Sequence, residues 1–541
     1  MDIEPVIIEN LSFRYRSRAE PAIQNINLRV SAGQLVLIAG ASGCGKTTLA
    51  RCINGLIPRS YKGEVQGRIL LQGQDTAALS LARISQLVGT VLQDPERQIL
   101  GTRVANEVAF GLENLGLPRQ EILQRVEQAL DYLGISHLRD RETFNLSGGE
   151  KQKIALAGVL AMQPRILLLD EPLASLDPAS AQEALALARR LADEGMTILM
   201  IEHRVEDVLS IQPDRALFMN KGQIEYDGPA EGLEKHVDYR QVKLPARLIM
   251  KMASRQPPPP RLEVLPGGKA KPENAAAPLV KFEDASFWYE PERPALEGVT
   301  LEIQRGDIIA VLGPNGAGKT TLVKHAIGLL KPKRGRVLVE GRDTRDLSVA
   351  QIAHTLGYVF QSPSHMLFAP TVYDELAFGP TNLGQKPQEM EQATREAIQI
   401  VNLEGLEKYP PLAMSFGQQK RVSIAAVLAM RSRILAMDEP TAGQDYQNYI
   451  SFMEAILQMP GFEAILFITH DVDLAVAYSN RVLLVNQGRL VCDGSPYEVL
   501  KDQERLTSNR LVPTSLLRAN LDFYPRTGRF MKAEELAHAV L

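Results

Sequence analysis

Two glycine-rich segments of the chain combine the residue types that bind phosphate. GPNGAGKTT at positions 313–321 follows the apolar run 308–312, and GASGCGKTT at positions 40–48 follows the apolar run 35–39. Glycines let consecutive backbone N–H groups turn toward one anion, and the helix that follows adds its positive end. A glycine-rich turn that matches by chance is a poor alternative, because the full pattern stands between an expected strand and an expected helix. Each segment is therefore predicted to bind a nucleoside triphosphate.

The lysine and the first threonine of each segment have separate expected roles. Lys46 and Lys319 supply a point charge to the β- and γ-phosphates, and Thr47 and Thr320 offer a hydroxyl to Mg²⁺. The residues predicted to contact the nucleotide in these segments are Gly40, Ser42, Gly43, Gly45, Lys46, Thr47, Thr48, Gly313, Asn315, Gly316, Gly318, Lys319, Thr320 and Thr321.

Two further segments place a pair of carboxylates at the end of an apolar strand. They read ILLLDE at 166–171 and ILAMDE at 434–439. The first carboxylate, Asp170 or Asp438, is placed to hold Mg²⁺ directly or through water. The second, Glu171 or Glu439, can polarise the water that attacks the γ-phosphate. Acidic pairs at strand ends often only face solvent or cap a helix. The recurrence downstream of both glycine-rich segments favours the catalytic interpretation.

A histidine follows the next apolar strand in both halves of the chain. His203 comes after TILMI at 197–201, and His470 comes after a similar run that ends at 468. A single histidine at a strand end is more often structural than catalytic. Because it recurs in both halves, we favour contact with the γ-phosphate or its attacking water.

These paired motifs keep an almost constant spacing, which identifies an internal repeat. Lys319 follows Lys46 by 319 − 46 = 273 positions, and Asp438 follows Asp170 by 438 − 170 = 268 positions. Coincidence does not hold such a register. The chain is therefore predicted to be a tandem duplication.

The duplication sets the expected domain boundaries. Residues 1–254 and 279–500 are predicted to form two domains, each of roughly the usual domain size. They are joined by 255–278, whose Pro, Ala and Gly content cannot build a core and is typical of an exposed linker. A tail, 501–541, ends in a helical pattern over 533–541 and carries no motif with an evident use.

The elements that must position these residues alternate within each copy. Short apolar strands are followed by helical segments such as 179–192, which predicts an α/β domain. The helical run 120–133 falls outside this alternation. It predicts a helical insertion between the Gln93 region and the segment at 146–152.

Composition narrows the classes of protein that remain. The 60 Lys and Arg residues are balanced by 64 Asp and Glu, a net charge of −4, which gives no sign of a large nucleic-acid-binding surface. The three cysteines form neither a metal-spaced nor a disulfide-like set, which suits a reducing compartment. No run approaches the ~20 apolar residues of a membrane-spanning helix. We expect a soluble chain that reaches a membrane only through a partner.

Two segments with no role in a generic P-loop protein complete the set. They read LSGGEKQ at 146–152 and MSFGQQ at 414–419. With the motifs above and the glutamines Gln93 and Gln361, the chain resembles the ATP-binding-cassette (ABC) ATPases over nearly its whole length. The resemblance implies two P-loop NTPase domains, each with a RecA-like α/β core and a helical subdomain, that bind ATP and Mg²⁺.

The resemblance also implies that the domains pair head to tail, with each ATP between the P-loop of one and the signature segment of the other. Site one then combines the P-loop, Asp170, Glu171 and His203 of the first domain with Ser415 and Gly417. Site two combines the corresponding residues of the second domain with Ser147, Gly148 and Gly149. Gln93 and Gln361 are implied metal and nucleotide contacts. Tyr15 and Tyr289 match the aromatic that stacks on adenine, although either could equally pack locally within a strand.

The signature segment of the second copy departs from the family pattern. Phe416 stands where the family has glycine, and Gln418 replaces the acidic residue seen at Glu150. A side chain at 416 restricts φ and crowds the close approach that glycine permits. We hypothesise an asymmetric pair in which site two is the stronger hydrolase and site one is slower but active. The alternative is that Phe416 is tolerated without effect.

The segments after Gln93 and Gln361 indicate a narrower group. EVAFGLENLG at 107–116 and ELAFGPTNLG at 375–384 are similar to the ATPases of energy-coupling-factor (ECF) importers, which take up vitamins, vitamin precursors and transition-metal ions such as cobalt or nickel. The alternative is that these residues are a packed helix of any cassette protein. The resemblance implies two partners: a transmembrane coupling protein and a small substrate-binding membrane protein. The chain would then sit at the cytoplasmic face of the cell membrane, and a thiamine-type precursor is the favoured cargo.

Two rival interpretations remain. A soluble, ribosome-acting tandem cassette protein would have a long charged helical linker, which 255–278 does not resemble. A fused ATPase of a sugar importer usually loses catalytic residues in one copy, whereas both carboxylate pairs are present here. A fused ATPase of a peptide importer is harder to exclude.

Overall fold

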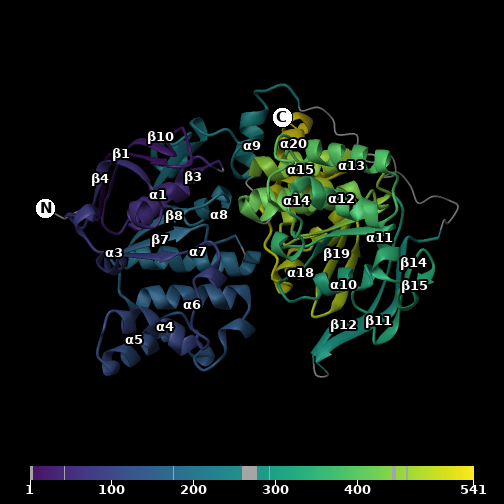
Figure 1. Cartoon of the computed structure of the whole chain (residues 1–541), viewed down its shortest axis with the longest axis horizontal. Helices are drawn as coiled ribbons and strands as arrows, with labels where there is room; N and C mark the ends of the chain where they lie inside the picture. The colour runs from purple at the N-terminus through teal and green to yellow at the C-terminus, as the bar shows by residue number, and fades with distance from the viewer. Residues whose placement is uncertain are drawn as a thin grey trace. The chain divides into compact units, whose positions relative to one another are not determined.

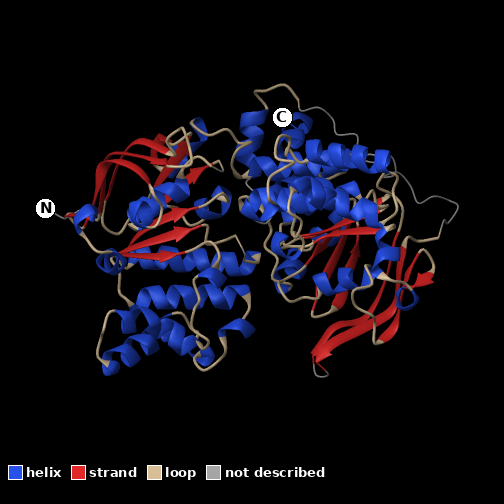
Figure 2. Ribbon diagram, viewed as in Figure 1, coloured by secondary structure: helices blue, strands red, loops and turns tan. Residues whose placement is uncertain are grey.

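The computed structural model describes residues 4–41, 43–174, 176–258, 277–290, 293–440, 446–458 and 461–540. Within these ranges the chain forms two compact units, and each contains one copy of the repeat. Figure 1 labels the elements, and Figure 2 shows helices on the faces of the sheets. We refer to the two copies as the first and the second cassette.

The first cassette is built on a six-stranded sheet in the order β10-β9-β3-β8-β7-β6. All pairs from β9 to β6 are parallel, and β10 adds an antiparallel edge. Strands β3 and β8 are buried along their whole length, which explains their unbroken apolar sequence. The bounds are β3 (Leu35–Gly40), β6 (Val88–Val91), β7 (Ile166–Asp170), β8 (Thr197–Ile201), β9 (Arg215–Asn220) and β10 (Gln223–Gly228).

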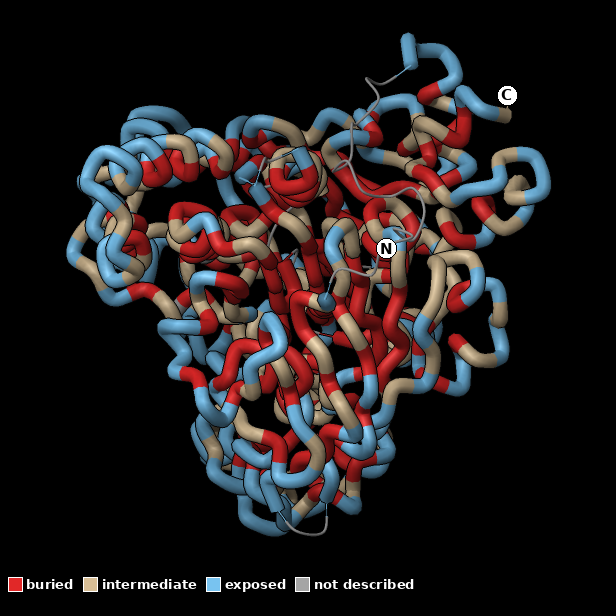
Figure 3. Tube along the Cα trace, turned by 90° about the vertical axis from the view of Figure 1, so that its right-hand side faces the viewer, coloured by how far each residue is buried: buried red, intermediate tan, exposed pale blue. Residues whose placement is uncertain are grey.

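A second, antiparallel sheet in the order β2-β1-β4-β5 belongs to the same cassette. Its buried side chains share one hydrophobic core with those of the large sheet and of helix α1, including Ile8, Ile38 and Leu49. Figure 3 shows such buried stretches in red. The bounds are β1 (Val6–Tyr15), β2 (Ile23–Val30), β4 (Gly63–Leu71), β5 (Gln74–Asp75), α1 (Lys46–Ile53), α2 (Leu56–Arg59), α3 (Leu81–Leu87), α7 (Pro178–Asp193) and α8 (Val205–Leu209).

Three helices form a separate layer with its own core, and the second of them corresponds to the predicted helical run 120–133. They are α4 (Val104–Asn114), α5 (Arg119–Tyr132) and α6 (Gly148–Ala161). Val108, Leu130 and Ile154, one from each helix, are fully buried and belong to one hydrophobic core. The predicted fold, an α/β core with a helical subdomain, is confirmed.

The second cassette repeats this plan, with sheets ordered β16-β17-β18-β13-β19-β20 and β12-β11-β14-β15. Its strands are β11 (Val280–Glu290), β12 (Arg293–Ile303), β13 (Ile308–Leu312), β14 (Arg334–Val339), β15 (Arg342–Asp343), β16 (Leu356–Val359), β17 (Ile434–Asp438), β18 (Ala464–Ile468), β19 (Arg481–Asn486) and β20 (Arg489–Gly494). Its helices are α10 (Lys319–Ala326), α11 (Val349–Ala353), α12 (Val372–Asn382), α13 (Pro387–Ile400), α14 (Phe416–Ala429), α15 (Tyr446–Gln458) and α16 (Val472–Tyr478).

The C-terminal tail folds into helices and takes up a helix from before the linker. The tail helices are α18 (Gln503–Ser508), α19 (Ser515–Thr527) and α20 (Ala533–Val540), and they follow α17 (Pro496–Leu500). Helix α9 (Ala246–Ala253) packs against α19 and α20. The backbone N–H of Ala246 donates to Ser515 Oγ at 2.7 Å, and Arg247 pairs with Asp522 at 2.9 Å.

The compact units divide between Leu244 and Pro245. The sequence-based boundary at 254 places α9 in the first domain, whereas the structure packs it in the second unit. The reason is the apolar face of α9, whose Ile249, Met250 and Ala253 are buried. Most of the predicted linker, 259–276, lies outside the described residues.

Candidate nucleotide-binding sites

The glycine-rich loop joins a buried central strand to a helix in both cassettes, as the sequence predicts. Lys46 Nζ donates to the carbonyl oxygens of Gly40 and Ala41 at 2.8 and 2.9 Å. Lys319 Nζ makes the same bonds to Gly313 and Pro314, at 2.8 and 2.9 Å. The ammonium group is thus held over its own loop, where an anion bound by the loop's N–H groups would meet it.

The first glycine of each loop is required by a close backbone approach. Gly40 and Gly313 have φ of 152° and 150°, which L-residues rarely adopt. A Cβ at Gly40 would collide with the carbonyl oxygen of Met219, and one at Gly313 would collide with that of Val485. Each loop therefore leaves the sheet beside the neighbouring strand, β9 or β19, with no room for a side chain.

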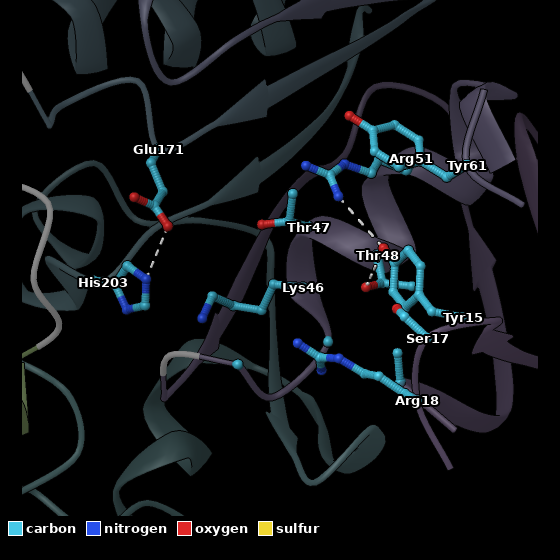
Figure 4. A pocket seen from close by; sticks show the side chains of 13 residues that line it. Tyr15, Ser17, Arg18, Lys46, Thr47, Thr48, Arg51, Tyr61, Glu171 and His203 are labelled. Atoms are coloured by element: carbon cyan, nitrogen blue, oxygen red, sulfur yellow. Dashed lines mark hydrogen bonds and ion pairs between the residues drawn. The ribbon is translucent and has the colours of Figure 1, made fainter. Parts of the chain in front are cut away.

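A pocket of about 380 Å³ lies over the first loop. Figure 4 shows Lys46 and Thr47 between the Glu171–His203 pair on one side and Tyr15 on the other. Predicted residues that line it are Tyr15, Gly43, Gly45, Lys46, Thr47, Thr48, Glu171 and His203. Gly40, Gln93 and Asp170, also predicted for this site, are not among the described residues that line the pocket, and Ser42 lies outside the described residues.

The pocket contains basic and aromatic residues that were not predicted from the sequence. Arg51 contacts the Tyr15 hydroxyl at 3.4 Å, and its guanidinium lies 4.2 Å from the Tyr61 ring centroid. Arg18 also lines the pocket. Two guanidinium groups beside the loop suit a polyanionic ligand. Arg51 follows Thr47 by one helical turn of α1, a spacing that could have revealed it.

The tyrosines predicted to stack on adenine stand at the ends of their strands. The Tyr15 hydroxyl lies 3.2 Å from Thr48 Oγ1, and the Tyr289 hydroxyl lies 3.4 Å from Thr321 Oγ1. Each ring also meets a phenylalanine of its own strand edge-on, Phe13 or Phe287. Both hydroxyls are therefore tied to the P-loop helix. Stacking on adenine stays a prediction.

The two candidate catalytic glutamates are held in the same unusual backbone conformation. Glu171 and Glu439 have φ of 51° and 46°, a left-handed geometry that costs energy in a residue with a side chain. The N–H of each donates at 2.9 Å to a carbonyl of the adjacent strand, that of Ile201 or Ile468. This bond fixes the turn at the end of β7 or β17 and aims the carboxylate.

Each of these glutamates contacts the predicted histidine of its own cassette. His203 Nε2 lies 2.9 Å from Glu171 Oε1, and His470 Nδ1 lies 2.9 Å from Glu439 Oε1. In the first cassette Gln93 Nε2 also donates to Glu171 Oε2 at 2.5 Å. Gln361, its counterpart, is exposed. The structure thus brings together the glutamate and histidine of both sites, and the glutamine of one.

Electrostatics separate the aspartate from the glutamate of each pair. Burial, together with the charge of Glu171, raises the pKa of Asp170 to about 6. Burial also opposes ionisation of Glu171, but the hydrogen bond and charge of His203 and the charge of Lys46 outweigh it, so its pKa lies below the usual range. The balance in Glu439 is the same, with His470 and Lys319 in these roles. Both glutamates are therefore ionised at neutral pH, as a base that orients water requires.

The second cassette surrounds its aspartate with additional donors. Thr320 Oγ1 donates to Asp438 Oδ2 at 2.7 Å, and the Tyr358 hydroxyl donates to the same oxygen at 2.9 Å. Behind the pair, the fully buried Lys420 of α14 donates to the carbonyl of Gln361 at 2.7 Å. Burial lowers the pKa of Lys420 to about 8. Tyr358 and Lys420 were not found from the sequence.

The first cassette has a buried carboxylate where the second has a threonine. Glu202 is 2% exposed, and its two oxygens accept from the backbone N–H groups of Leu173 and His203 at 2.9 and 3.0 Å. Burial and the charge of Glu171 raise the pKa of Glu202 to about 7. Thr469 takes the corresponding place before His470. The sequence contained a signal for this carboxylate, because Glu202 precedes His203 in the first copy whereas Thr469 precedes His470 in the second.

The signature segments begin helices α6 and α14. Ser147 and Ser415 are N-caps, and each forms a capping box with the residue three positions later, Glu150 or Gln418. The replacement of Glu150 by glutamine in the second copy thus keeps the cap and removes its charge.

The structure corrects one part of the argument about Phe416. Gly148, Gly149 and Gly417 do not have positive φ, and Phe416 is the first residue of helix α14. The expected restriction of φ does not arise, because any residue adopts a right-handed helical backbone. The expected crowding and the pairing of these segments with the P-loops across the two cassettes stay predictions.

Taken with the fold, two P-loop sites in α/β cassettes with helical subdomains define an ABC-type ATPase. The sequence model of the family described as ABC transporter matches residues 23–174 and 296–442, which is more than half of the chain. The chain belongs to this family. ATP hydrolysis by its members is coupled to transport, so the chain is an ATP-binding, ATP-hydrolysing transport protein.

Relatives along nearly the whole length have the same description. An ABC transporter ATP-binding protein of Caldanaerobacter subterraneus is 35% identical over 98% of this chain and 98% of that protein. One of Streptococcus pneumoniae is 39% identical over 97% of each. A solved structure, cbiO1 from Clostridium perfringens, described as part of the ABC transporter complex cbiONQ, is 30% identical and covers 47% of this chain and 95% of that one, with a TM-score of 0.40.

Proposed function

We propose that the chain is the fused ATPase of an ECF-type importer for a vitamin, a vitamin precursor or a transition-metal ion, with a thiamine-type precursor favoured. The observation that carries the proposal is an apolar surface in each cassette, defined by one exposed side chain just before the helix that follows the predicted glutamine segment and one exposed side chain on that helix. In the first cassette Leu100 is 69% and Phe110 45% exposed. In the second, Phe368 is 61% and Phe378 52% exposed, and their rings meet edge-on at 4.7 Å.

A buried glutamate holds each of these surfaces in place. Glu107 accepts from the backbone N–H groups of Leu100 and Gly101 at 2.8 and 2.6 Å. Glu375 accepts from those of Phe368 and Ala369, both at 2.8 Å. Two N–H bonds to a buried carboxylate fix the loop that carries the exposed Leu100 or Phe368 side chain. Exposed aromatic groups held in this way are typical of a docking surface.

The residues of each site are suited to hydrolysis of a terminal phosphate. The loop N–H groups and Lys46 or Lys319 bind the phosphates, and Glu171 or Glu439 orients the attacking water and accepts its proton. His203 or His470 holds the glutamate by the contact described above. The ionised glutamate and the fixed lysine need no rearrangement before the reaction.

Oxygen donors at each site fit Mg²⁺. Asp170 has a buried oxygen, Oδ1, without a hydrogen-bond partner among the described residues, and Thr320 and Asp438 bring two oxygens within 2.7 Å of each other. Hydroxyl and carboxylate oxygens are the ligands that Mg²⁺ prefers. The proposed ligands are Thr47, Asp170 and Gln93 in the first cassette and Thr320, Asp438 and Gln361 in the second. Bound Mg²⁺ would neutralise charge on the β- and γ-phosphates.

The proposed partners are a transmembrane coupling protein that docks on the two apolar surfaces and a small substrate-binding membrane protein. No helix among the described residues is long and apolar enough to cross a membrane. The proposed location, the cytoplasmic face of the cell membrane, therefore rests on these partners. ATP-driven closure of the cassettes would move the docked protein, and hydrolysis would reset it.

The test is co-purification of the tagged full chain from its native cells in mild detergent, with the bound proteins identified by mass spectrometry. We expect two small polytopic membrane proteins with the wild type and their loss with Phe110→Asp plus Phe378→Asp. Val491→Asp is the matched control, because Val491 is 45% exposed on strand β20, outside the surface.

Two other outcomes would overturn the proposal. Ribosomal proteins without a membrane partner would reassign the ATPase to translation. Permease subunits accompanied by a peptide-binding protein would favour the fused ATPase of a peptide importer.

A further inference from the structure

The aspartates proposed to bind Mg²⁺ stand in the same strand position in both cassettes but have different neighbours. Asp438 ends β17, and the strand beside it, β16, runs parallel with Tyr358 opposite Ala436. This register brings the Tyr358 hydroxyl to Asp438 Oδ2 at 2.9 Å. Tyr358 is 7% and Asp438 3% exposed, so the bond is shielded from water.

The first cassette has no equivalent donor at this position. Its register is the same, with Thr90 of β6 opposite Leu168 of β7, and Asp170 ends β7. A threonine side chain lacks the length of a tyrosine. Correspondingly, Oδ1 of Asp170 is buried without a hydrogen-bond partner among the residues that the structure describes.

Two hydroxyls fix the orientation of the second aspartate before any metal arrives. Thr320 and Tyr358 both donate to Oδ2, so the carboxylate cannot rotate freely about its last bond. The Tyr358 ring is itself held edge-on against Phe360 at 4.6 Å between centroids. Groups that orient a metal ligand typically change metal affinity 10- to 100-fold when they are removed.

We propose that Tyr358 is a positioning residue for Asp438 and that it makes the metal site of the second cassette tighter than that of the first. The inference rests on the proposed role of Asp170 and Asp438 as metal ligands. It attributes a difference in metal affinity between the two sites to Tyr358, a residue that lies outside the motifs on which the family resemblance is based.

The test measures metal binding directly, without turnover. Mn²⁺ replaces Mg²⁺ as an oxygen-preferring ion, and the free Mn²⁺ signal is followed by electron paramagnetic resonance while the full chain is titrated with a non-hydrolysable ATP analogue present. We expect two classes of site in the wild type. Tyr358→Phe keeps the ring and removes only the hydroxyl, and it should weaken the tight class about tenfold. Thr90→Val is the matched control and should change neither class.

A tight class that keeps its affinity in Tyr358→Phe would overturn the inference. Asp438→Asn separates this failure from a failure of the proposed site. If Asp438→Asn abolishes the tight class while Tyr358→Phe leaves it unchanged, Asp438 is a ligand and Tyr358 does not position it. If Asp438→Asn also leaves it unchanged, the assignment of the metal site is wrong. Thermal unfolding of each variant verifies that it is folded.

Discussion

Asp438 and Glu439 of the second cassette lie among hydroxyl donors and a buried ammonium, whereas Asp170 and Glu171 of the first lie near an additional buried carboxylate. Tyr358 and Lys420 supply the donors on one side, and Glu202 supplies the negative charge on the other. The strands, the loops and the strained glutamates are the same in both. A duplicated scaffold can therefore keep its catalytic geometry while the groups behind it give each copy a different electrostatic environment.

The largest expected difference between the cassettes is catalytic. Glu439→Gln should lower the ATPase kcat on the order of 100-fold, because a positioned base contributes at least about this factor. Glu171→Gln should leave it nearly unchanged, since site one is proposed to supply only the small turnover that remains in Glu439→Gln. Steady-state ATPase assays measure both, with nucleotide binding by fluorescence as the control for folding. Equal losses would remove the asymmetry.

The buried carboxylate of the first cassette should give it a distinct pH dependence. With a pKa of about 7 in the folded state and 4.5 as its ordinary value, Glu202 holds its proton more tightly when folded. Its contribution to stability is full below pH 4.5 and is lost as the pH rises through about 7. Relative to Glu202→Gln, the wild type should lose about 2.5 kcal/mol of unfolding free energy between pH 5 and 8.

Urea unfolding of both proteins at several pH values measures this change. A pH-independent difference in unfolding free energy between the wild type and Glu202→Gln reflects only the altered hydrogen bonds and does not bear on the titration of Glu202. Curves that stay parallel from pH 5 to 8 would show that Glu202 does not titrate in this range.

The buried ammonium of the second cassette should matter for stability. Lys420→Met leaves the carbonyls of Phe360 and Gln361 without this donor, which should cost about 2 kcal/mol. Gln152, the counterpart in α6, donates to the Pro172 carbonyl, and Gln152→Met should cost about 1 kcal/mol. Chemical unfolding followed by cassette-specific fluorescence compares the two variants. A larger loss of unfolding free energy in Gln152→Met than in Lys420→Met would contradict this prediction.

The smallest expected effect concerns the altered signature segment. In a Glu439→Gln background, where site one carries the remaining turnover, Phe416→Gly should raise the ATPase rate roughly two- to threefold if the side chain crowds the nucleotide, an effect of well under about 1 kcal/mol. An unchanged rate would mean that Phe416 is tolerated. Gly148→Phe in the first cassette is the reciprocal control.

The sequence was sufficient for the fold and for locating the segments that carry the candidate site, because both depend on local patterns. The P-loops, the carboxylate pairs and the helical insertion α5 follow from spacing and periodicity alone. Tyr358 could not be found in this way, because its bond to Asp438 joins residues 80 positions apart and exists only through the pairing of β16 with β17. Lys420 has the spacing of an ordinary helical residue, and nothing local shows that α14 buries it.

The division of the chain was the least predictable feature for the same physical reason. The sequence of an amphipathic helix such as α9 shows that it has an apolar face, but not which surface that face packs against. That partner, α19 and α20, lies about 270 residues later in the chain. Composition predicts a linker over 255–278, but it did not show on which side of α9 the compact units divide.

The docking of α9 determines where the gene can be cut into two separately made halves. Residues up to Leu244 contain nearly all of the first compact unit. A second half that starts at 279 would lack α9, and the apolar surfaces of α19 and α20 that it covers would face water. Two subunits derived from this chain should therefore be divided before Pro245, so that the second keeps both the helix and the proline-rich segment as its own N-terminal extension.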